Sequence, residues 1–125
     1  MIFIEHDNPD IERLHIAAQS TRLWILNALT RKDKMYASNI ARELDIERKI
    51  IAFHLNTLEK AGLVKSEFGL SDDYRPTAVK YYQLTQKGKE IFEDILKILK
   101  KCDYSYHFRN KVQINITVFS YILFF

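Results

Sequence analysis

Cysteine, glycine and proline are all scarce in this 125-residue sequence, which contains one cysteine, three glycines and two prolines. A single thiol, Cys102, excludes an internal disulfide and a multi-thiolate metal site, and it is typical of a protein from a reducing compartment. So few chain-breaking residues argue against an all-β domain with many tight turns and favour long helices with few loops. The chain is long enough for one hydrophobic core and too short for two independent ones.

The sequence also lacks an uninterrupted apolar run of the length that a membrane helix needs. Its longest apolar tract, residues 112–125, is interrupted by polar residues and is shorter than the roughly 20 residues of a bilayer span. Residues 1–10 carry three acidic residues and lack the basic segment of a secretory signal. We therefore expect a cytoplasmic protein without a membrane partner. The alternative is a protein that the apolar tail tethers to a membrane.

A strong excess of charge of either sign is absent as well, since the formal net charge is only +3. Residues 1–36 contain five basic and five acidic residues, and residues 37–84 contain seven of each. The remaining residues contain seven basic and four acidic residues, so the excess lies in the C-terminal third. An argument for a polyanionic partner must therefore rest on where individual cations lie, and not on the total.

The spacing of apolar residues predicts four helices, a β-hairpin and a last helix. Asn8 (followed by Pro9), Ser20, Ser38 and Thr85 are the expected N-caps. A short helix after Ser38 and a longer one over residues 47–61 flank a tight turn, and Gly62 stands where a helix-ending glycine belongs. The hairpin is expected over residues 63–84. The alternating pattern of residues 112–118 is compatible with a strand or with the end of a helix.

The helix predicted over residues 47–61 has one apolar and one polar face. At 100° per residue, Ile51, Leu55 and Leu58 share the side expected to be buried. The opposite side carries Lys49, Phe53, Asn56 and Lys60, with Ala52 and Thr57 beside them and Arg48 in the first turn.

The outward side chains of this helix suit a major groove of DNA. Cations bind phosphates, an amide can bond adenine twice, and small or apolar groups contact thymine methyls. The alternative is a solvated helix face. An exposed Phe53 favours a contact surface, for DNA or for another protein.

Residues 37–67 resemble the helix-turn-helix of the ArsR-type winged-helix regulators, especially their archaeal relatives. The resemblance rests on His54–Leu55, on Leu58 and on the Ala-Gly-Leu-Val run at 61–64. It extends through the return strand and following helix, with Lys80-Tyr-Tyr-Gln-Leu-Thr85, Lys87 and Gly88, and covers about residues 37–100. The fold class is then mainly α with a small β-hairpin wing, a winged helix-turn-helix with extra N- and C-terminal helices.

The resemblance implies a sequence-specific regulator of transcription that binds double-stranded DNA. Because nothing in the sequence arranges a nucleophile or paired acids, we expect no enzyme activity. Residues 48–56 would enter the major groove, and the hairpin would contact the adjacent backbone or minor groove. Arg75 at the hairpin tip is the candidate for the minor groove, although Asp72 and Asp73 beside it repel phosphate. The competing interpretation of this tip is a solubilising turn with an internal Asp–Arg pair. The candidate DNA-contacting residues are Ser38, Arg48, Lys49, Ala52, Phe53, His54, Asn56, Thr57, Lys60, Lys65, Arg75 and Lys80.

The sequence departs from the metal-sensing members of that family. It has no Cys-x-Cys motif before the turn and no cluster of His and carboxylates on the last helix, so we expect no metal and no cofactor. Cys102 is expected to be a small buried residue. Glu47 replaces the Ser or Thr that often opens the recognition helix. His54 is expected to be packed or to contact phosphate, and one of Tyr81 and Tyr82 is expected in the core with the other on the surface.

The apolar surface predicts a homodimer, because a monomer of this size can hardly bury all of it. We expect three segments: helices in 1–36 that support the core and the dimer, a DNA-binding segment 37–84, and a dimerising helix and apolar tail in 85–125. The main alternative function is a winged helix that binds proteins without binding DNA. Convergence of Lys49, Lys60, Lys65 and Lys80 on one surface would separate the two.

Overall fold

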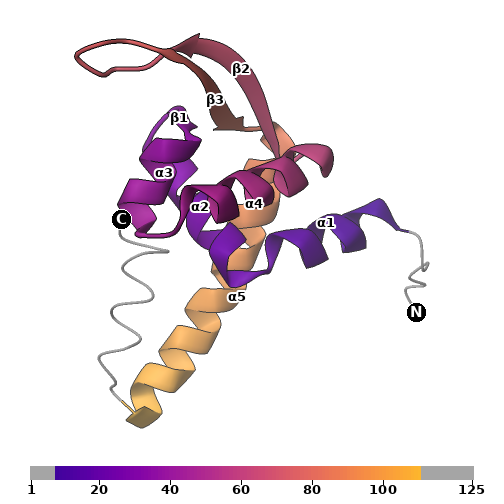
Figure 1. The fold of residues 1–125 in the computed structure, drawn as a ribbon. Helices are drawn as coiled ribbons and strands as arrows, with labels where there is room; N and C mark the ends of the chain where they lie inside the picture. The colour runs from indigo at the N-terminus through magenta and orange to yellow at the C-terminus, as the bar shows by residue number, and fades with distance from the viewer. Residues whose placement is uncertain (1–7, 111–125) are drawn as a thin grey trace.

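The computed structural model describes residues 8–110, with side chains described up to residue 101. Five helices and three strands follow in the order α1 (Pro9–Ala17), α2 (Ser20–Arg31), β1 (Met35–Tyr36), α3 (Ala37–Leu44), α4 (Arg48–Lys60), β2 (Val64–Leu70), β3 (Ala78–Leu84) and α5 (Gln86–Asn110). The β2–β3 hairpin projects from one end of the helical cluster, and α5 extends from the other (Figure 1). The backbone of residues 103–110 continues α5, whereas the expectations for residues 111–125, including the alternation in 112–118, and for the Cys102 side chain lie outside the described residues.

Two of the expected helix caps are present and two are wrong. The Asn8 side chain accepts a hydrogen bond from the backbone N–H of Asp10 at 2.8 Å, and the Thr85 hydroxyl accepts one from the N–H of Gly88 at 3.0 Å. Helix α2, however, begins one residue earlier than expected, because the longer side chain of Gln19 accepts from the N–H of Arg22 at 2.9 Å. Ser38 lies inside α3, which begins at Ala37 after Tyr36.

Two residues with positive φ end the helices of the helix-turn-helix. Asp45 ends α3 with φ 54°, and the N–H of Ile46 then donates to the carbonyl of Ala41 at 3.1 Å. Gly62 follows α4 with φ 78°, a conformation that costs glycine little because it has no Cβ. The chain therefore reverses sharply on both sides of α4, as the sequence predicts.

The sheet has three strands in the order β1-β3-β2, all antiparallel. The hairpin was expected, but β1 was missed because it is two residues long and follows a charged turn. Met35 pairs with Tyr82 and Tyr36 pairs with Tyr81. This added strand covers the edge of β3 and links the start of α3 to the base of the wing.

Strand β1 also explains why the expectation for the two tyrosines is wrong. Tyr81 and Tyr82 are both buried, at 7% and 8% exposure, although they point to opposite sides of β3. The Tyr81 ring packs edge-on against Tyr36 at 5.5 Å, and its hydroxyl donates to the carbonyl of Leu70 at 2.7 Å. Burial is the largest cause that raises the pKa of Tyr81. The hydroxyl therefore stays protonated and remains a hydrogen-bond donor to Leu70.

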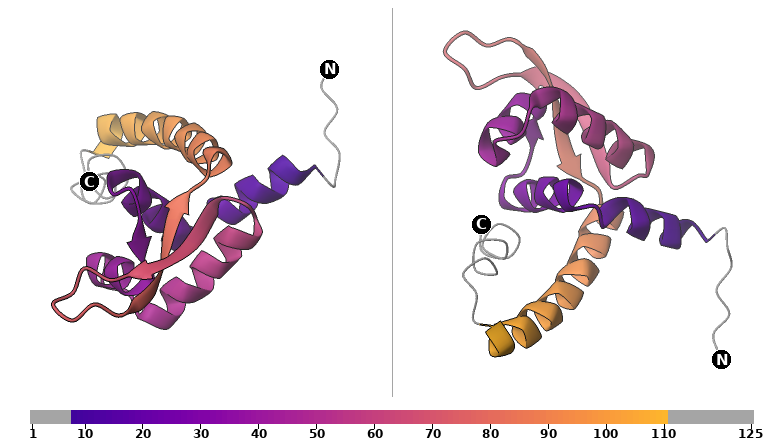
Figure 2. Two further views of the ribbon diagram at one scale, coloured as in Figure 1. Left: turned by 90° about the horizontal axis from the view of Figure 1, so that it is seen from above. Right: turned by 60° about the horizontal axis from the view of Figure 1, so that its bottom comes forward.

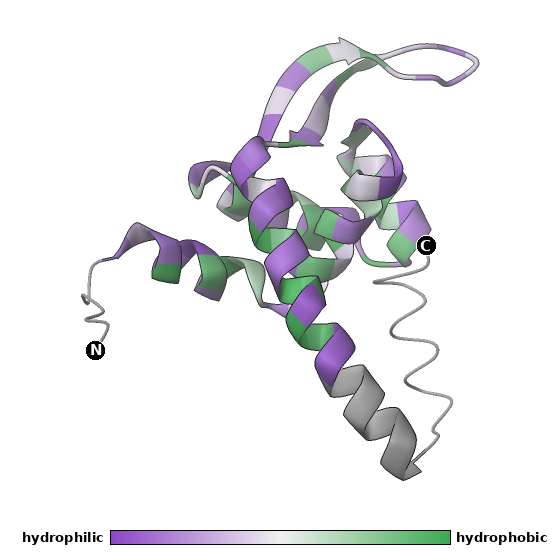
Figure 3. Cartoon of the chain, turned by 180° about the vertical axis from the view of Figure 1, so that it is seen from behind, coloured by the Kyte–Doolittle hydropathy of each residue, from purple (hydrophilic) through white to green (hydrophobic). Residues whose placement is uncertain are grey.

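Helix α2 lies at the centre of the fold and contacts all four other helices and β3. Its Leu26, Leu55 of α4 and Phe92 of α5 belong to one buried cluster, so all three expected segments of the chain share a core. Polar and apolar residues alternate along the described part of α5 (Figure 3). Within residues 8–110, no helix is long and apolar enough to cross a membrane.

Candidate nucleic-acid interface

Helix α4 presents one face to the core and the other to solvent, as its sequence predicts. Ile51, Leu55 and Leu58 are completely buried, against helices that include α2 and α3. Figure 2 shows α4 and α5 on opposite sides of the molecule. The outer face of α4 is therefore turned away from α5 and is accessible to a binding partner.

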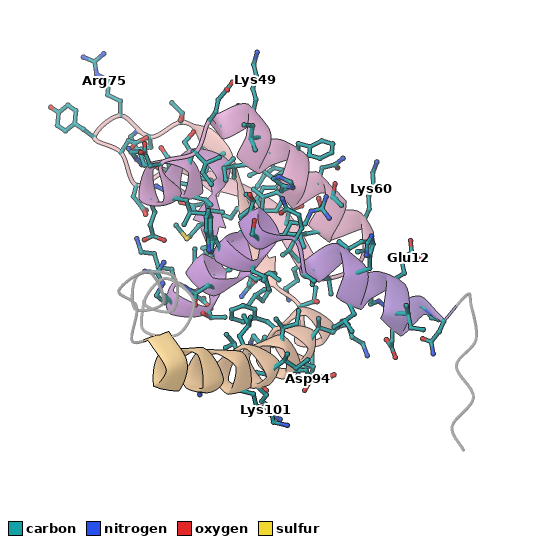
Figure 4. The ribbon with its side chains drawn as sticks, turned by 90° about the horizontal axis from the view of Figure 1, so that it is seen from below. Glu12, Lys49, Lys60, Arg75, Asp94 and Lys101 are labelled. Carbon is teal, nitrogen blue, oxygen red and sulfur yellow. The ribbon has the colours of Figure 1, made fainter. Side chains whose placement is uncertain are left out.

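The outer face of α4 displays the predicted mixture of side chains. Lys49, Phe53, Asn56 and Lys60 are exposed, and Phe53 is 61% exposed. Lys49 and Lys60 project from the same side of the helix (Figure 4). Arg48 is exposed as well, while Ala52 and Thr57 are half-buried. In the described part of the chain, no carboxylate pairs with any of the three cations.

His54 has a different role from its neighbours on α4. It is only 9% exposed, and its Nδ1 accepts a hydrogen bond from Nε of Arg22 at 3.1 Å. The same guanidinium donates to the carbonyl of Ile16 at 3.1 Å. The burial of the ring and the hydrogen bond at Nδ1 therefore support the packed interpretation of His54 over the phosphate-contacting one. His54 and Arg22 together fix α4 on α2.

The contact between Arg22 and His54 predicts that the protein loses stability in mild acid. Burial and then the Arg22 charge lower the pKa of His54 below its ordinary value of 6.5. The unfolded chain therefore takes up a proton before the folded one does, so the stabilisation is complete above pH 6.5 and declines as the pH falls below it. We expect the Tm measured by circular dichroism to decrease between pH 7.5 and pH 5. In a His54→Gln variant this part of the decrease should be absent, and an unchanged pH profile would contradict the role of His54.

The wing places Arg75 at its tip, pointing away from the body of the protein (Figure 4). The loop is closed by Ser71 and Thr77, with hydrogen bonds of 2.9 Å between their backbones and 3.0 Å from the Thr77 N–H to the Ser71 hydroxyl. Within residues 8–110 no ion pair joins Arg75 to Asp72 or Asp73. The expected alternative of an internal Asp–Arg pair is therefore not found, and the guanidinium is available to a partner.

The structure does not bring the four lysines whose common surface would favour DNA binding, Lys49, Lys60, Lys65 and Lys80, together on one face. Lys80 forms an ion pair with Glu59 of α4 at 3.5 Å and lies over the Tyr82 ring at 5.5 Å. Both neighbours raise the pKa of Lys80, and the effect of Tyr82 is the larger. Lys65 pairs in register with Gln83 and lines a small pocket beside Tyr81. Because side chains alternate across a strand, Lys65 lies on the face of the wing opposite Lys80 and away from α4.

Ser38 lies at the start of α3 and not on α4. It lines a shallow groove, together with Arg42 and Arg48, formed by α3, the turn after it and the first residue of α4. Arg42 was missed in the sequence, although the apolar side of α3 leaves it outward. It is exposed, and in the described structure it has no ion pair. Asp45 and Glu47 in the same groove oppose its charge.

The fold and this interface define the class of the protein. Three helices, of which the last is exposed along one face, followed by a β-hairpin, form a winged helix-turn-helix. Within the described residues, no three His, Cys, Asp or Glu side chains are placed to hold a metal ion. Residues 19–66, from the start of α2 into β2, match the family described as "Bacterial regulatory protein, arsR family". Residues 19–66 of this chain are thus similar to the helix-turn-helix of the ArsR-type regulators, which confirms the resemblance seen in the sequence.

Solved structures of regulators share this fold. A transcriptional regulator homologue from Pyrococcus horikoshii is 29% identical with a TM-score of 0.61, covering 75% of this chain and 92% of its own. A protein described as a "Possible transcriptional regulator for arsenical resistance" is 28% identical with a TM-score of 0.52, covering 68% and 80%. A MarR-family protein from Enterococcus faecalis shows the fold alone, at 20% identity, a TM-score of 0.63 and coverage of 89% and 94%. No curated protein sequence matches this chain.

The family match and the relatives together establish the broad function. The chain is a winged-helix transcription regulator that binds DNA, and its fold is that of regulators and not of enzymes.

Proposed function

We propose that the protein binds specific sequences of double-stranded DNA with α4 in the major groove and the β2–β3 wing on the adjacent backbone. The observation that carries this proposal is the outer face of α4. It combines Lys49, Asn56 and Lys60, which are exposed, on a helix whose other face is anchored in the core. An α-helix presented in this way has the dimensions to enter a major groove.

Each side chain on this face has a chemical role in the proposed complex. Arg48, Lys49 and Lys60 bind phosphates, whose contacts set the position of the helix without selecting a sequence. Asn56 bonds the N6 and N7 positions of an adenine, and Phe53 with Ala52 contacts thymine methyl groups. Thr57 lies beside them, although its hydroxyl donates to the Phe53 carbonyl at 3.2 Å and is left only as an acceptor.

Two further regions complete the proposed interface. Ser38 and Arg42 face the phosphates beside the start of α4, and Arg75 enters the minor groove, where negative potential attracts a guanidinium. Asp72 and Asp73 weaken this contact by repelling phosphate. We leave out Lys65, which lies on the opposite face of the wing, and His54, which is buried. Lys80 stays with Glu59 and supports the wing.

We further propose a homodimer that binds two half-sites about one helical turn apart, as regulators with this motif usually do. Residues 37–84 would face DNA, and the flanking helices would form the dimer. Helix α5 lies on the opposite side of the molecule from α4 (Figure 2), whereas α1 lies beside the C-terminal end of α4. Both α1 and α5 expose apolar side chains to solvent. Ile11 and Leu14 are each 42% exposed, and Ile98 is 57% exposed. A second copy would remove these side chains from water.

A fluorescence titration of a duplex of about 30 base pairs tests the proposal. Each phosphate that a cation neutralises contributes roughly 0.9 to the slope of log K against log salt. The five cations of the proposed interface, Arg42, Arg48, Lys49, Lys60 and Arg75, therefore predict a slope of about −4.5 for each chain. When the duplex concentration is far above the Kd, the end point should correspond to two chains per duplex. A flat salt dependence would rule out this set of contacts, and an end point of one chain would rule out the dimer.

A second candidate function is a winged helix that binds a protein. The exposed ring of Phe53 and the failure of the four lysines to converge both favour it. The same titration separates the two functions, because a DNA-binding protein with these free cations must bind duplex at about 50 mM salt. If no binding occurs there, the surface around Phe53 becomes the docking surface for a protein partner.

A further inference from the structure

A cavity of about 510 Å³ lies on the side of the molecule away from the DNA-facing surface of α4. It is open to solvent on one side and is bounded by the C-terminal half of α2, the end of β3 and the first turns of α5. Leu29, Leu84 and Phe92 line it, and each is almost completely buried. The volume falls within the roughly 300–1,000 Å³ of pockets for small organic ligands.

The polar residue that distinguishes this cavity is Asn27 on α2. Asn27 lines the cavity and is only 4% exposed. Its backbone carbonyl accepts a hydrogen bond from the Thr30 hydroxyl at 2.6 Å, but its side-chain amide has no hydrogen-bond partner in the part of the chain that the structure describes.

A buried amide without a partner destabilises a folded protein, and most buried polar groups are therefore paired. The leucines and Phe92 around Asn27 offer it nothing to bond. A partner from outside the protein can reach the amide through the cavity. The amide offers such a partner one acceptor and two donors.

The charges at the cavity select against an ion. Arg31 and Lys89 line it together with Asp33 and Glu93, so the formal charges cancel. Arg31 is also held by Glu43 at 2.9 Å, which leaves no surplus of positive charge for an anion. Gln83 supplies a second amide on the same lining.

We propose that this cavity binds a small organic molecule without net charge, which offers a donor and an acceptor to Asn27 and an apolar body to Leu84 and Phe92. This site is separate from the proposed DNA interface. Its test uses no DNA, so failure of DNA binding would not affect the outcome.

Benzamide is a suitable probe, because it joins an uncharged amide to an apolar ring. Titrated into the ¹⁵N-labelled protein, it should produce saturable shifts of the backbone resonances of residues that line the cavity, at millimolar concentrations. Benzoate and benzylamine have the same ring with a negative or a positive charge, and each should bind at least about fivefold more weakly. In Asn27→Leu, benzamide should bind about tenfold more weakly, which corresponds to the loss of one good hydrogen bond.

The variants carry their own controls. Asn56→Ala removes an exposed amide outside the cavity and should leave benzamide binding unchanged. Asn27→Leu should also raise the Tm, by about 4 °C, because it removes a buried polar group that has no partner. The proposal is overturned if the resonances of the cavity residues do not shift even at the solubility limit of benzamide. It is equally overturned if Asn27→Leu binds benzamide as tightly as the parent protein. It is also overturned if the same resonances change with protein concentration and not with benzamide, since a second copy then covers the cavity.

Discussion

Replacing Gly88 by alanine is expected to lower the free energy of unfolding by about 3 kcal/mol, a large loss for a domain of this size. A Cβ at this position would lie 2.0 Å from the carbonyl oxygen of Leu63 and 3.0 Å from its carbonyl carbon. That oxygen accepts a hydrogen bond from the N–H of Thr85 at 3.1 Å, so it cannot move without disturbing the start of α5. In a helix with open space at this position, the same substitution would raise the free energy of unfolding by about 1 kcal/mol. A loss of stability would therefore indicate that Gly88 lies against the Leu63 carbonyl.

Two other substitutions calibrate the result for Gly88. Gly62→Ala meets no atom within 4 Å but keeps a φ of 78°, which costs an alanine about 1–2 kcal/mol. Gln86→Ala changes an exposed residue of the same helix and should have almost no effect. Urea unfolding followed by circular dichroism should therefore rank the loss as Gly88, then Gly62, then Gln86. A Gly88→Ala variant as stable as the parent would show that α5 and Leu63 do not approach as closely as described.

The local features of the fold were predictable because they depend on neighbours in the sequence. The 3.6-residue period places Ile51, Leu55 and Leu58 on one side of α4, and the structure buries all three. Gly62 was expected to have a positive φ for the same local reason. The cap at Thr85 was also predictable, because a hydroxyl three residues before an amide can reach it without help from the rest of the fold.

Apart from the misplaced N-caps of α2 and α3, the failures involve contacts between distant segments. The pairing of Tyr36 with Tyr81 joins residues whose separation in the sequence gives no period, so neither β1 nor the burial of Tyr81 could be predicted. The pattern of β2 and β3 was visible, but which lysine faces α4 depends on the register of the hairpin. Only the structure shows that Glu59 holds Lys80 while Lys65 lies on the other face.

The same limit applies to the buried polar groups. Arg22 and His54 are 32 residues apart, so the sequence leaves open whether His54 packs or contacts phosphate, and their hydrogen bond supports packing. Asn27 stands among apolar residues of α2, where the sequence alone suggests only a wide apolar helix. Its burial without a partner depends on where β3 and α5 come to lie.

The double variant Lys49→Ala/Asn56→Ala is expected to weaken binding to a selected operator by about 100-fold. An amide that bonds an adenine in two places contributes about 1–3 kcal/mol of discrimination, and the loss of a phosphate contact adds to it. A factor of 100 corresponds to about 2.7 kcal/mol. Both residues are exposed, so the Tm should stay within a few degrees of the parent. The operator is first selected from random duplexes with the parent protein, and affinity is then measured by fluorescence anisotropy.

The two substitutions should act in different ways, and this difference is the sharpest test of α4 as the recognition helix. Lys49→Ala alone should weaken binding to operator and random duplex alike and reduce the salt slope by about 1 for each chain. Asn56→Ala alone should weaken operator binding, leave random binding and the slope unchanged, and relax the preference for one adenine. Lys101→Ala removes the same charge from α5, away from Lys49 and Lys60 (Figure 4), and should change operator affinity less than threefold. If the double variant binds the operator as tightly as Lys101→Ala does, α4 does not contact the bases, and the recognition surface lies elsewhere on the fold.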